Sequence, residues 1–452
     1  MSESETTRRR HQGRRSSSHI ALVFGLQVLG LAAGFITHVM LARLMGDPGQ
    51  YGWVAVGQNV AQILAALVAF GIPMVIMRRA SQLSATGEHQ AILALRRLGS
   101  AALMRTTGLV LVPALILAAG AYFWPSGGTG EIVLVLVLAL LAAPFLALSR
   151  LYTGFSRTYG WFGLSVAPDR LWRPLLVLLL ALFQWWLWPP LVAAQALLAF
   201  VVASVVVALS MGFVTGRRQR ARASVQPGPG NDVAFTGSLW RVSAVFGAQS
   251  ILDVVVRRSD VILVGLMVGP ASAGIYFAAS RIAELLSMPS AAVGTVIAPR
   301  YARRRQMNDH HGLQRLVTLS AHASFWPTLA GVVLMFWLGE WVLAWFGEEF
   351  RAGTEILALL LLARLVLASA GRLQALLNMA GAEQSVLRLQ IGTAILNLFL
   401  LLILIPWYGA VGAALAHLLV WTTWVVVGSL ITRRQLGIRP GILGMLWRPT
   451  HE

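Results

Sequence analysis

Long apolar stretches, separated by short polar breaks, make up most of the chain. A helix needs about 20 mostly apolar residues to cross the hydrocarbon core of a bilayer. Twelve segments meet this requirement, at approximately residues 19–44, 51–76, 100–123, 131–154, 163–185, 189–214, 240–266, 273–298, 315–338, 353–379, 386–406 and 411–432. Segment 163–185 is the most interrupted, because Asp169, Arg170 and Arg173 lie in its first half. The pattern predicts an all-α polytopic membrane protein with about 12 transmembrane helices.

The polar connections between these segments differ sharply in charge. The two ends of the chain and the even-numbered connections together hold 25 arginines, whereas the odd-numbered connections hold only Arg43 and Arg351. Basic residues accumulate on the cytoplasmic side of membrane proteins. Both termini are therefore predicted to be cytoplasmic. The basic runs are interpreted as topology signals and lipid headgroup contacts, not as a nucleic-acid surface.

The longest polar break, at 215–237, lies near the middle of the chain and suggests a duplication. When the chain is shifted by 222 residues, ten of the thirty positions from Val23 to Gly52 are identical to their partners. Pro48 and Gly52 then align with Pro270 and Gly274. A shift of six spans preserves orientation, so the halves are predicted to be parallel repeats about an axis along the membrane normal.

The repeat divides the predicted architecture into two six-helix lobes with the substrate path between them. The predicted parts are a basic cytoplasmic tail at 1–18, an N-lobe at 19–214, a cytoplasmic linker at 215–239, a C-lobe at 240–432 and a cytoplasmic tail at 433–452. The linker contains the run QPGPGND and is expected to be flexible.

Composition supports a membrane location and removes several classes of chemistry. Hydrophobic residues make up 57% of the chain and charged residues only 12%. All 36 basic residues are arginines, so a Walker A lysine and a Schiff-base lysine are excluded. The absence of cysteine excludes thiolate catalysis, cysteine metal sites and disulfides. No residues show a catalytic pattern, so no enzyme activity, catalytic residue, metal site or cofactor is predicted.

Several charged residues fall inside the predicted spans, where an unpaired ion costs about 2.5–3.5 kcal/mol or more. The predicted substrate-binding set is cationic and comprises Arg257, Arg258, Arg281, Arg364, Arg170 and Arg173. The predicted ion-coupling or orienting set is acidic and comprises Asp253, Asp260 and Glu284. Asp253, Arg257 and Asp260 follow i, i+4, i+7 spacing and therefore share one helix face.

These charges have two interpretations. Neighbours such as Asp253 with Arg257, or Arg281 with Glu284, can form ion pairs that serve structure alone. Pairing does not account for the whole set, because the arginines outnumber the acids by two when Asp169 is included. A cationic cavity favours an anionic substrate, since the guanidinium group matches phosphate oxygens.

Neutral polar and aromatic residues add further candidates. The first two spans carry amides that can contact sugar hydroxyls or bond neighbouring helices, namely Gln27, Gln58, Asn59 and Gln62. Most tryptophans cluster at the external ends of spans, as interfacial anchors do. Trp421 and Trp424 lie inside the last span, where this explanation does not apply.

Five segments give the chain a family resemblance from Ser18 to Gln435. They are LARLMGDPGQYGWVAV, RRSDVILVGLMVGPASAGIYFAASRIAELL, IAPRYARR, LQALLNMAGAEQ and YGAVGAALAHLLV. In this order and spacing they resemble polysaccharide flippases of the multidrug/oligosaccharidyl-lipid/polysaccharide (MOP) exporter superfamily. The resemblance implies a two-lobed fold like that of the MATE transporters, working by alternating access.

The resemblance also implies a substrate and a location. The substrate would be an oligosaccharide repeat unit on undecaprenyl pyrophosphate, translocated across the bacterial inner membrane for O-antigen (lipopolysaccharide), capsule or exopolysaccharide synthesis. Implied partners are this lipid-linked glycan, membrane lipids and, as candidates, a polysaccharide polymerase and other assembly proteins; no nucleic acid is expected. The alternative function is a MATE-like multidrug or cation antiporter, although the cationic surplus disfavours a cationic substrate. A glycan polymerase or ligase is a third hypothesis, disfavoured by the short external connections.

Overall fold

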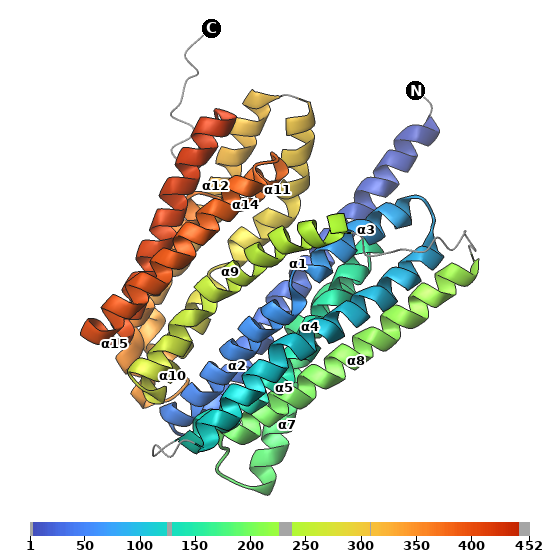
Figure 1. The fold of residues 1–452 in the computed structure, drawn as a ribbon. Coiled ribbons are helices and arrows are strands. Elements are labelled where there is room, and N and C mark those ends of the chain that lie inside the picture. The colour runs from blue at the N-terminus through green and yellow to red at the C-terminus, as the bar shows by residue number, and fades with distance from the viewer. Residues whose placement is uncertain (1–2, 124–128, 226–236, 308, 443–452) are drawn as a thin grey trace. The chain divides into compact units, whose positions relative to one another are not determined.

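The computed structural model describes residues 3–123, 129–225, 237–307 and 309–442, and every regular element within these ranges is a helix (Figure 1). The all-α prediction is therefore confirmed. Seven of the described helices are long and apolar enough to cross a membrane. The chain is thus a multi-pass membrane protein, and the placement of both termini in the cytoplasm stays a prediction.

The chain forms two compact units. The first comprises residues Met1–Thr37 and Val60–Ile251, and the second comprises His38–Asn59 and Leu252–Glu452. Helices α1 (Glu3–Met45), α2 (Pro48–Ala69) and α9 (Gly237–Met267) each contribute one stretch to both units. The predicted lobes, 19–214 and 240–432, stay predictions.

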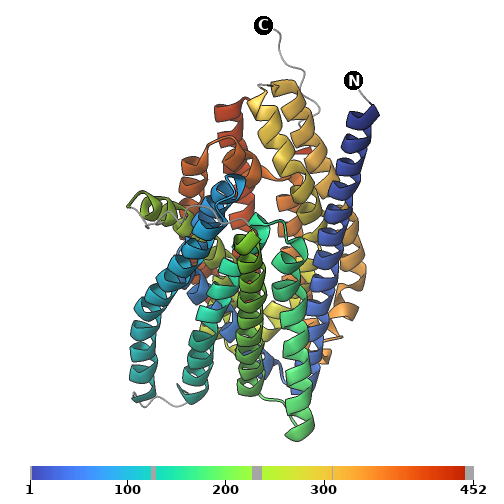
Figure 2. The same ribbon diagram turned by 90° about the vertical axis from the view of Figure 1, so that its right-hand side faces the viewer.

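The first unit is organised around α5 (Thr129–Thr158), which packs against α3, α4 and α8. The remaining elements are α3 (Ile72–Ala85), α4 (His89–Phe123), α6 (Phe162–Ala167), the π-helix η1 (Pro168–Trp172), α7 (Arg173–Leu187) and α8 (Ala193–Val225). Figure 2 shows α4, α5 and α8 running alongside one another. Their facing apolar side chains, such as Ile92, Leu151 and Phe155, are completely buried and form the core of this unit.

The second unit is organised around α13 (Thr354–Ser369), which packs against α10, α12 and α15. Its other elements are α10 (Pro270–Leu285), α11 (Met288–Gln306), α12 (His310–Leu343), the 3₁₀-helix η2 (Glu348–Gly353), α14 (Leu373–Met379) and α15 (Glu383–Leu436). Tyr301, Leu377 and Val386 are buried in a core that joins α11, α14 and α15.

Each of the twelve predicted segments coincides with helix, although some are interrupted. Segment 163–185 is built from α6, η1 and α7, and its wider π-turn falls on the charged residues that interrupt the apolar pattern. Segments 386–406 and 411–432 both lie in α15, which departs from helical geometry at Gly409, just after Pro406. Proline removes a backbone donor and glycine accepts a positive φ, so the two predicted spans meet at this kink.

The predicted tails and linker are partly helical. Helix α1 begins at Glu3, within the predicted tail at 1–18, and α15 continues to Leu436. Helix α8 extends to Val225, so the beginning of the predicted linker at 215–239 continues the preceding helix. Residues 226–236 and 443–452 lie outside the described ranges.

The break between α1 and α2 follows directly from the sequence GDP. Gly46 has a φ of +66°, a conformation that only glycine adopts at little cost. The Asp47 carboxylate accepts hydrogen bonds from the backbone N–H groups of Gly49 (2.9 Å) and Gln50 (3.1 Å), and so caps α2. Pro48 occupies the first helical position, where no backbone donor is needed.

An aspartate also begins α12. Hydrogen bonds from the backbone N–H of Gly312 and from the Arg304 guanidinium to the Asp309 carboxylate lower the pKa of this group below its usual value. Helices α2 and α12 therefore both begin after an aspartate whose carboxylate accepts hydrogen bonds from free backbone N–H groups.

The repeat-equivalent residues near the start of α2 and α10 contact one another. A Cβ atom at Gly52 would collide with the carbonyl oxygen of Pro270, and one at Gly274 would collide with that of Pro48. Pro270 and Gly274 are the residues that the 222-residue shift aligns with Pro48 and Gly52. Such reciprocal contacts are what a two-fold relation between two equivalent elements requires.

Replacing either glycine is expected to destabilise the second unit. Gly52→Ala or Gly274→Ala places a methyl group against backbone, which has no side chain to move aside, so the helices must separate. The expected result is a lower Tm and a smaller monodisperse yield in detergent. Gly34→Ala, on α1, is the matched control, because its Cβ would meet no atom within 4 Å. An unchanged Tm for both contact variants would contradict the close approach.

Candidate binding site

Helix α9 places four of the predicted site residues in the second unit, Asp253, Arg257, Arg258 and Asp260. The Asp253 carboxylate pairs with the Arg257 guanidinium at 3.0 Å, one helical turn away. The same guanidinium lies 4.8 Å from the centre of the Trp421 ring on α15, a cation–π contact. Both charged side chains remain more than one third exposed. The pair is thus open to a ligand.

The next residue, Arg258, uses a neutral partner. Its Nη1 donates to the Asn59 Oδ1 of α2 at 3.3 Å. No carboxylate in the described ranges forms an ion pair with it. Its charge is therefore not cancelled by direct contact.

The helix pair α10 and α13 supplies the other predicted cations of the second unit, Arg281 and Arg364. Arg281 pairs with Glu284 at 2.8 Å and lies over the Phe277 ring at 4.5 Å. Arg364 has no ion pair to a carboxylate of the described residues. The Nε atoms of Arg281 and Arg364 are both buried without a hydrogen-bond acceptor in the described part of the chain. Donors in this state have free capacity for an anion.

Asp260 differs from the other acids because it is buried among protein groups. Its side chain accepts hydrogen bonds from the Tyr276 hydroxyl (2.7 Å) and the Val261 backbone N–H (2.9 Å). His417 Nδ1 lies 3.4 Å from its Oδ2, and Trp421 Nε1 donates to His417 Nε2 at 3.0 Å. Asp260 thus ends a chain that fixes His417 and, through it, Trp421.

The first unit holds a separate arginine cluster. Arg173 is buried, pairs with Asp169 at 2.5 Å and donates to Ser149 Oγ at 3.2 Å. Arg170 is exposed on the adjoining π-turn, against which Gly30 of α1 packs closely. Its backbone carbonyl would lie 2.8 Å from a Cβ at Gly30, so this glycine serves close helix packing.

Two further arginines belong to this cluster and are not among the predicted site residues. Arg150 donates to Gln62 Oε1 at 2.6 Å, and both Arg150 and Arg157 interact electrostatically with Asp169. The sequence alone assigns them to a basic cytoplasmic connection. Their i, i+7 spacing on one face of α5 is the signal that could have found them. Asp169 is thus shared by Arg150, Arg157 and Arg173 in this unit.

The predicted residues are therefore divided between the two units. The second unit contains Arg257, Arg258, Arg281, Arg364, Asp253, Asp260 and Glu284, whereas Arg170 and Arg173 belong to the first. Their roles in binding or coupling stay predictions. Within the described ranges, no group of three or more His, Asp or Glu side chains is arranged to hold a metal ion.

A family model described as "Polysaccharide biosynthesis protein" matches residues 18–304, more than half of the chain. The chain belongs to this family. The predicted resemblance to MOP-superfamily polysaccharide proteins is thus confirmed at the level of the family. No curated protein has a significantly similar sequence.

Solved structures confirm that the chain has a MATE-like fold. A MATE structure in complex with MaL6 has a TM-score of 0.68 at 14% identity, covering 93% of this chain and 96% of its own. An outward-facing multidrug resistance MATE family transporter of the MOP superfamily has a TM-score of 0.67 at 15% identity, covering 93% and 95%. A MOP superfamily transporter from Pyrococcus furiosus, described as having a binding pocket of reverse polarity, has a TM-score of 0.65 at 14% identity, covering 93% and 95%.

The protein is expected to depend on Asp260 for stability much more than on Asp253. Asp260→Ala leaves the buried Tyr276 hydroxyl without its acceptor and removes the carboxylate that lies 3.4 Å from His417 Nδ1. A buried unsatisfied donor costs about 1–3 kcal/mol. Asp253→Ala breaks a half-exposed pair, which is worth about 0–1 kcal/mol. Thermal unfolding of the purified variants should show a clear fall in Tm for Asp260→Ala alone. Equal Tm values would show that Asp260 is not a structural anchor.

Proposed function

We propose that this protein is a flippase that translocates an undecaprenyl-pyrophosphate-linked oligosaccharide by alternating access. The proposal rests on one observation, that the positive charges of several buried arginines are only partly neutralised by the protein. Arg281 and Arg364 in the second unit, and Arg173 in the first, each keep a buried Nε atom without an acceptor in the described residues. A substrate with several phosphate oxygens provides the acceptors that the protein omits.

The charge balance within each unit supports an anionic substrate. In the second unit, Asp253, Glu284 and Asp260 are engaged by Arg257, Arg281 and the Tyr276–His417 pair respectively. Arg258 and Arg364 form no ion pair with a described carboxylate, and Glu284 and Asp260 act on both only electrostatically. In the first unit, Asp169 is shared by several arginines. Pyrophosphate would bind where these guanidinium groups form no ion pair with the described part of the protein.

The fold supports movement between two openings. Structures of a multidrug resistance MATE transporter in outward-facing and inward-facing conformations both resemble this chain, with TM-scores of 0.67 and 0.64. We infer that this protein alternates between similar states in the bacterial inner membrane, with both termini cytoplasmic. Its product would be a surface polysaccharide such as O-antigen, capsule or exopolysaccharide. The polymerase and other assembly proteins that consume the flipped unit are proposed partners.

A MATE-like multidrug or cation antiporter is the second candidate, favoured by the names of the structural neighbours. A cationic drug requires a membrane acid whose charge is not cancelled by a base. In the described part of the second unit, each predicted acid already contacts a donor or cation. For the Pyrococcus furiosus transporter, a binding pocket of reverse polarity suggests a different function. In this protein, a surplus of positive charge likewise favours an anionic substrate, and therefore the flippase.

Leaflet-specific labelling of the undecaprenyl-linked glycan in membrane vesicles tests the proposal. A deletion strain should accumulate the lipid-linked unit on the cytoplasmic face, and the intact gene should restore outward exposure. Unchanged sidedness in a strain without a redundant flippase would overturn the proposal. Altered drug resistance with intact surface glycan would favour the antiporter.

Arg258→Ala and Arg364→Ala should each slow outward exposure about ten-fold or more, because a hydrogen bond to a charged group contributes about 1.5–3 kcal/mol. The matched control is Arg351→Ala, which removes the same charge from an exposed ion pair with Glu348. Each variant should insert at wild-type abundance. If both site variants export glycan at the control rate, the arginines do not bind the substrate.

A further inference from the structure

A pocket in the second unit brings polar and aromatic side chains together from three helices. It encloses about 320 Å³ of empty space, including its open mouth. It is lined by Leu252, Asp253 and Val256 of α9, Gln374 of α14, and Gln390, Thr393, Val420, Trp421 and Trp424 of α15. This space is too small for a whole oligosaccharide.

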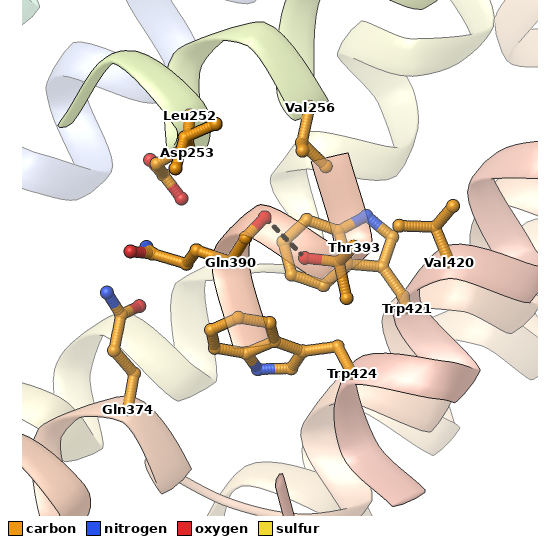
Figure 3. A pocket seen from close by; sticks show the side chains of 9 residues that line it. All are labelled: Leu252, Asp253, Val256, Gln374, Gln390, Thr393, Val420, Trp421 and Trp424. Carbon is orange, nitrogen blue, oxygen red and sulfur yellow. Dashed lines mark hydrogen bonds between the residues drawn. The ribbon is translucent and has the colours of Figure 1, made fainter. Parts of the chain in front are cut away.

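The polar groups of this pocket lie on one side and the indoles on the other. Figure 3 shows the Gln390 amide between the Asp253 carboxylate and the Gln374 amide, with the Trp421 and Trp424 rings across from them. The two rings meet edge to face, with centroids 6.2 Å apart and planes inclined by 70°. They form an apolar corner opposite a row of hydrogen-bonding groups.

Within this row of polar groups, Gln390 has a side-chain oxygen without a hydrogen-bond donor. Its side chain is only 4% exposed, yet its Oε1 has no hydrogen-bond donor in the described residues. Thr393 does not supply one, because its hydroxyl donates to the backbone carbonyls of Leu389 and Gln390. A buried acceptor without a donor destabilises the empty protein. A ligand hydroxyl in the pocket would remove this penalty.

Trp421 is held in place independently of any ligand. Its Nε1 donates to His417, which lies against the buried Asp260, and its ring carries the Arg257 guanidinium. A ring fixed by several contacts loses little conformational entropy on binding. The buried network of Asp260 therefore positions one wall of the pocket, and Asp260 is a positioning residue for it.

We propose that this pocket binds a single neutral pyranose ring of the transported glycan. A pyranose has apolar C–H faces that pack against an indole and hydroxyl groups at its edge that hydrogen-bond to amides and carboxylates. The Asp253 carboxylate accepts hydroxyl donors and repels the carboxylate of an acidic sugar. The inference rests on the proposed function and deepens it, because it gives the second unit a sugar-selecting subsite distinct from the uncompensated arginines.

The test uses the full-length protein in nanodiscs and saturation-transfer NMR. The probes are the methyl glycosides of glucose, galactose and rhamnose, the methyl glycosides of N-acetylglucosamine and N-acetylgalactosamine, and methyl glucuronide. At least one neutral glycoside should receive saturation from the protein, and the glucuronide should not. Gln390→Leu keeps the side-chain volume while removing the unpaired acceptor, so its Tm should equal or exceed that of the wild type. Its binding of the neutral glycoside should nevertheless fall about ten-fold, as expected for a lost ligand hydrogen bond.

Trp424→Leu provides a second variant, and exposed Trp337→Leu on α12 is its matched control. Trp424→Leu should lose glycoside binding, whereas the control should retain it. Binding of the glucuronide alone, or equal binding by Gln390→Leu and the wild type, would overturn the proposal. So would the absence of any glycoside signal together with wild-type glycan export by both pocket variants.

The two proposals fail in different ways. If the deletion strain shows unchanged glycan sidedness but the neutral glycoside binds and Gln390→Leu abolishes it, the flippase proposal is wrong and the sugar pocket stands. If deletion blocks outward exposure while the pocket variants bind and export normally, the flippase stands and the sugar pocket is wrong.

Discussion

The cost of placing a guanidinium group in a membrane governs this protein. Hydrocarbon provides no water for an arginine, so a charged side chain within a span needs a partner or a polar cavity. In this protein, the partners neutralise only part of the arginine charge and leave some guanidinium donors without an acceptor among the described residues. Asp253 and Glu284 each form an ion pair with an arginine one helical turn away. Arg258 donates to an amide, and Arg364 forms no ion pair with a described carboxylate. The remaining positive charge is what the proposed phosphate-bearing substrate would neutralise.

The acids of the second unit divide into two kinds. Asp253 forms a half-exposed pair at the edge of a pocket, while Asp260 is buried and binds Tyr276 and Val261. The difference is physical, because a buried carboxylate is tolerated only when several donors replace its water. Asp260 therefore connects the membrane charge network to Trp421 through His417. Through this connection, one buried acid orients an aromatic wall that faces hydrogen-bonding amides.

The duplication is expressed in packing as well as in sequence. Gly52 and Gly274 are equivalent in the repeat, and each approaches the backbone beside the other. The charged residues do not follow the repeat, since Asp253 and Arg257 align with Leu31 and Phe35. The first turns of α2 and α10 thus keep the symmetric contact that packing requires, whereas the charged residues differ between the two halves. An asymmetric substrate with a phosphate end and a sugar end suits such an arrangement.

The sequence by itself determined the all-helical membrane class, the positions of the spans and the pairs Asp253–Arg257 and Arg281–Glu284. These are local properties, set by hydrophobic length and by side chains one helical turn apart. Only the tertiary structure decided that Asp260 is buried against His417, that Arg150 joins Arg173 around Asp169, and that Gln374, Gln390 and Trp424 face one pocket. These groups come from distant helices or from opposite ends of one kinked helix. Their meeting depends on how helices pack, which hydrophobic periodicity does not encode.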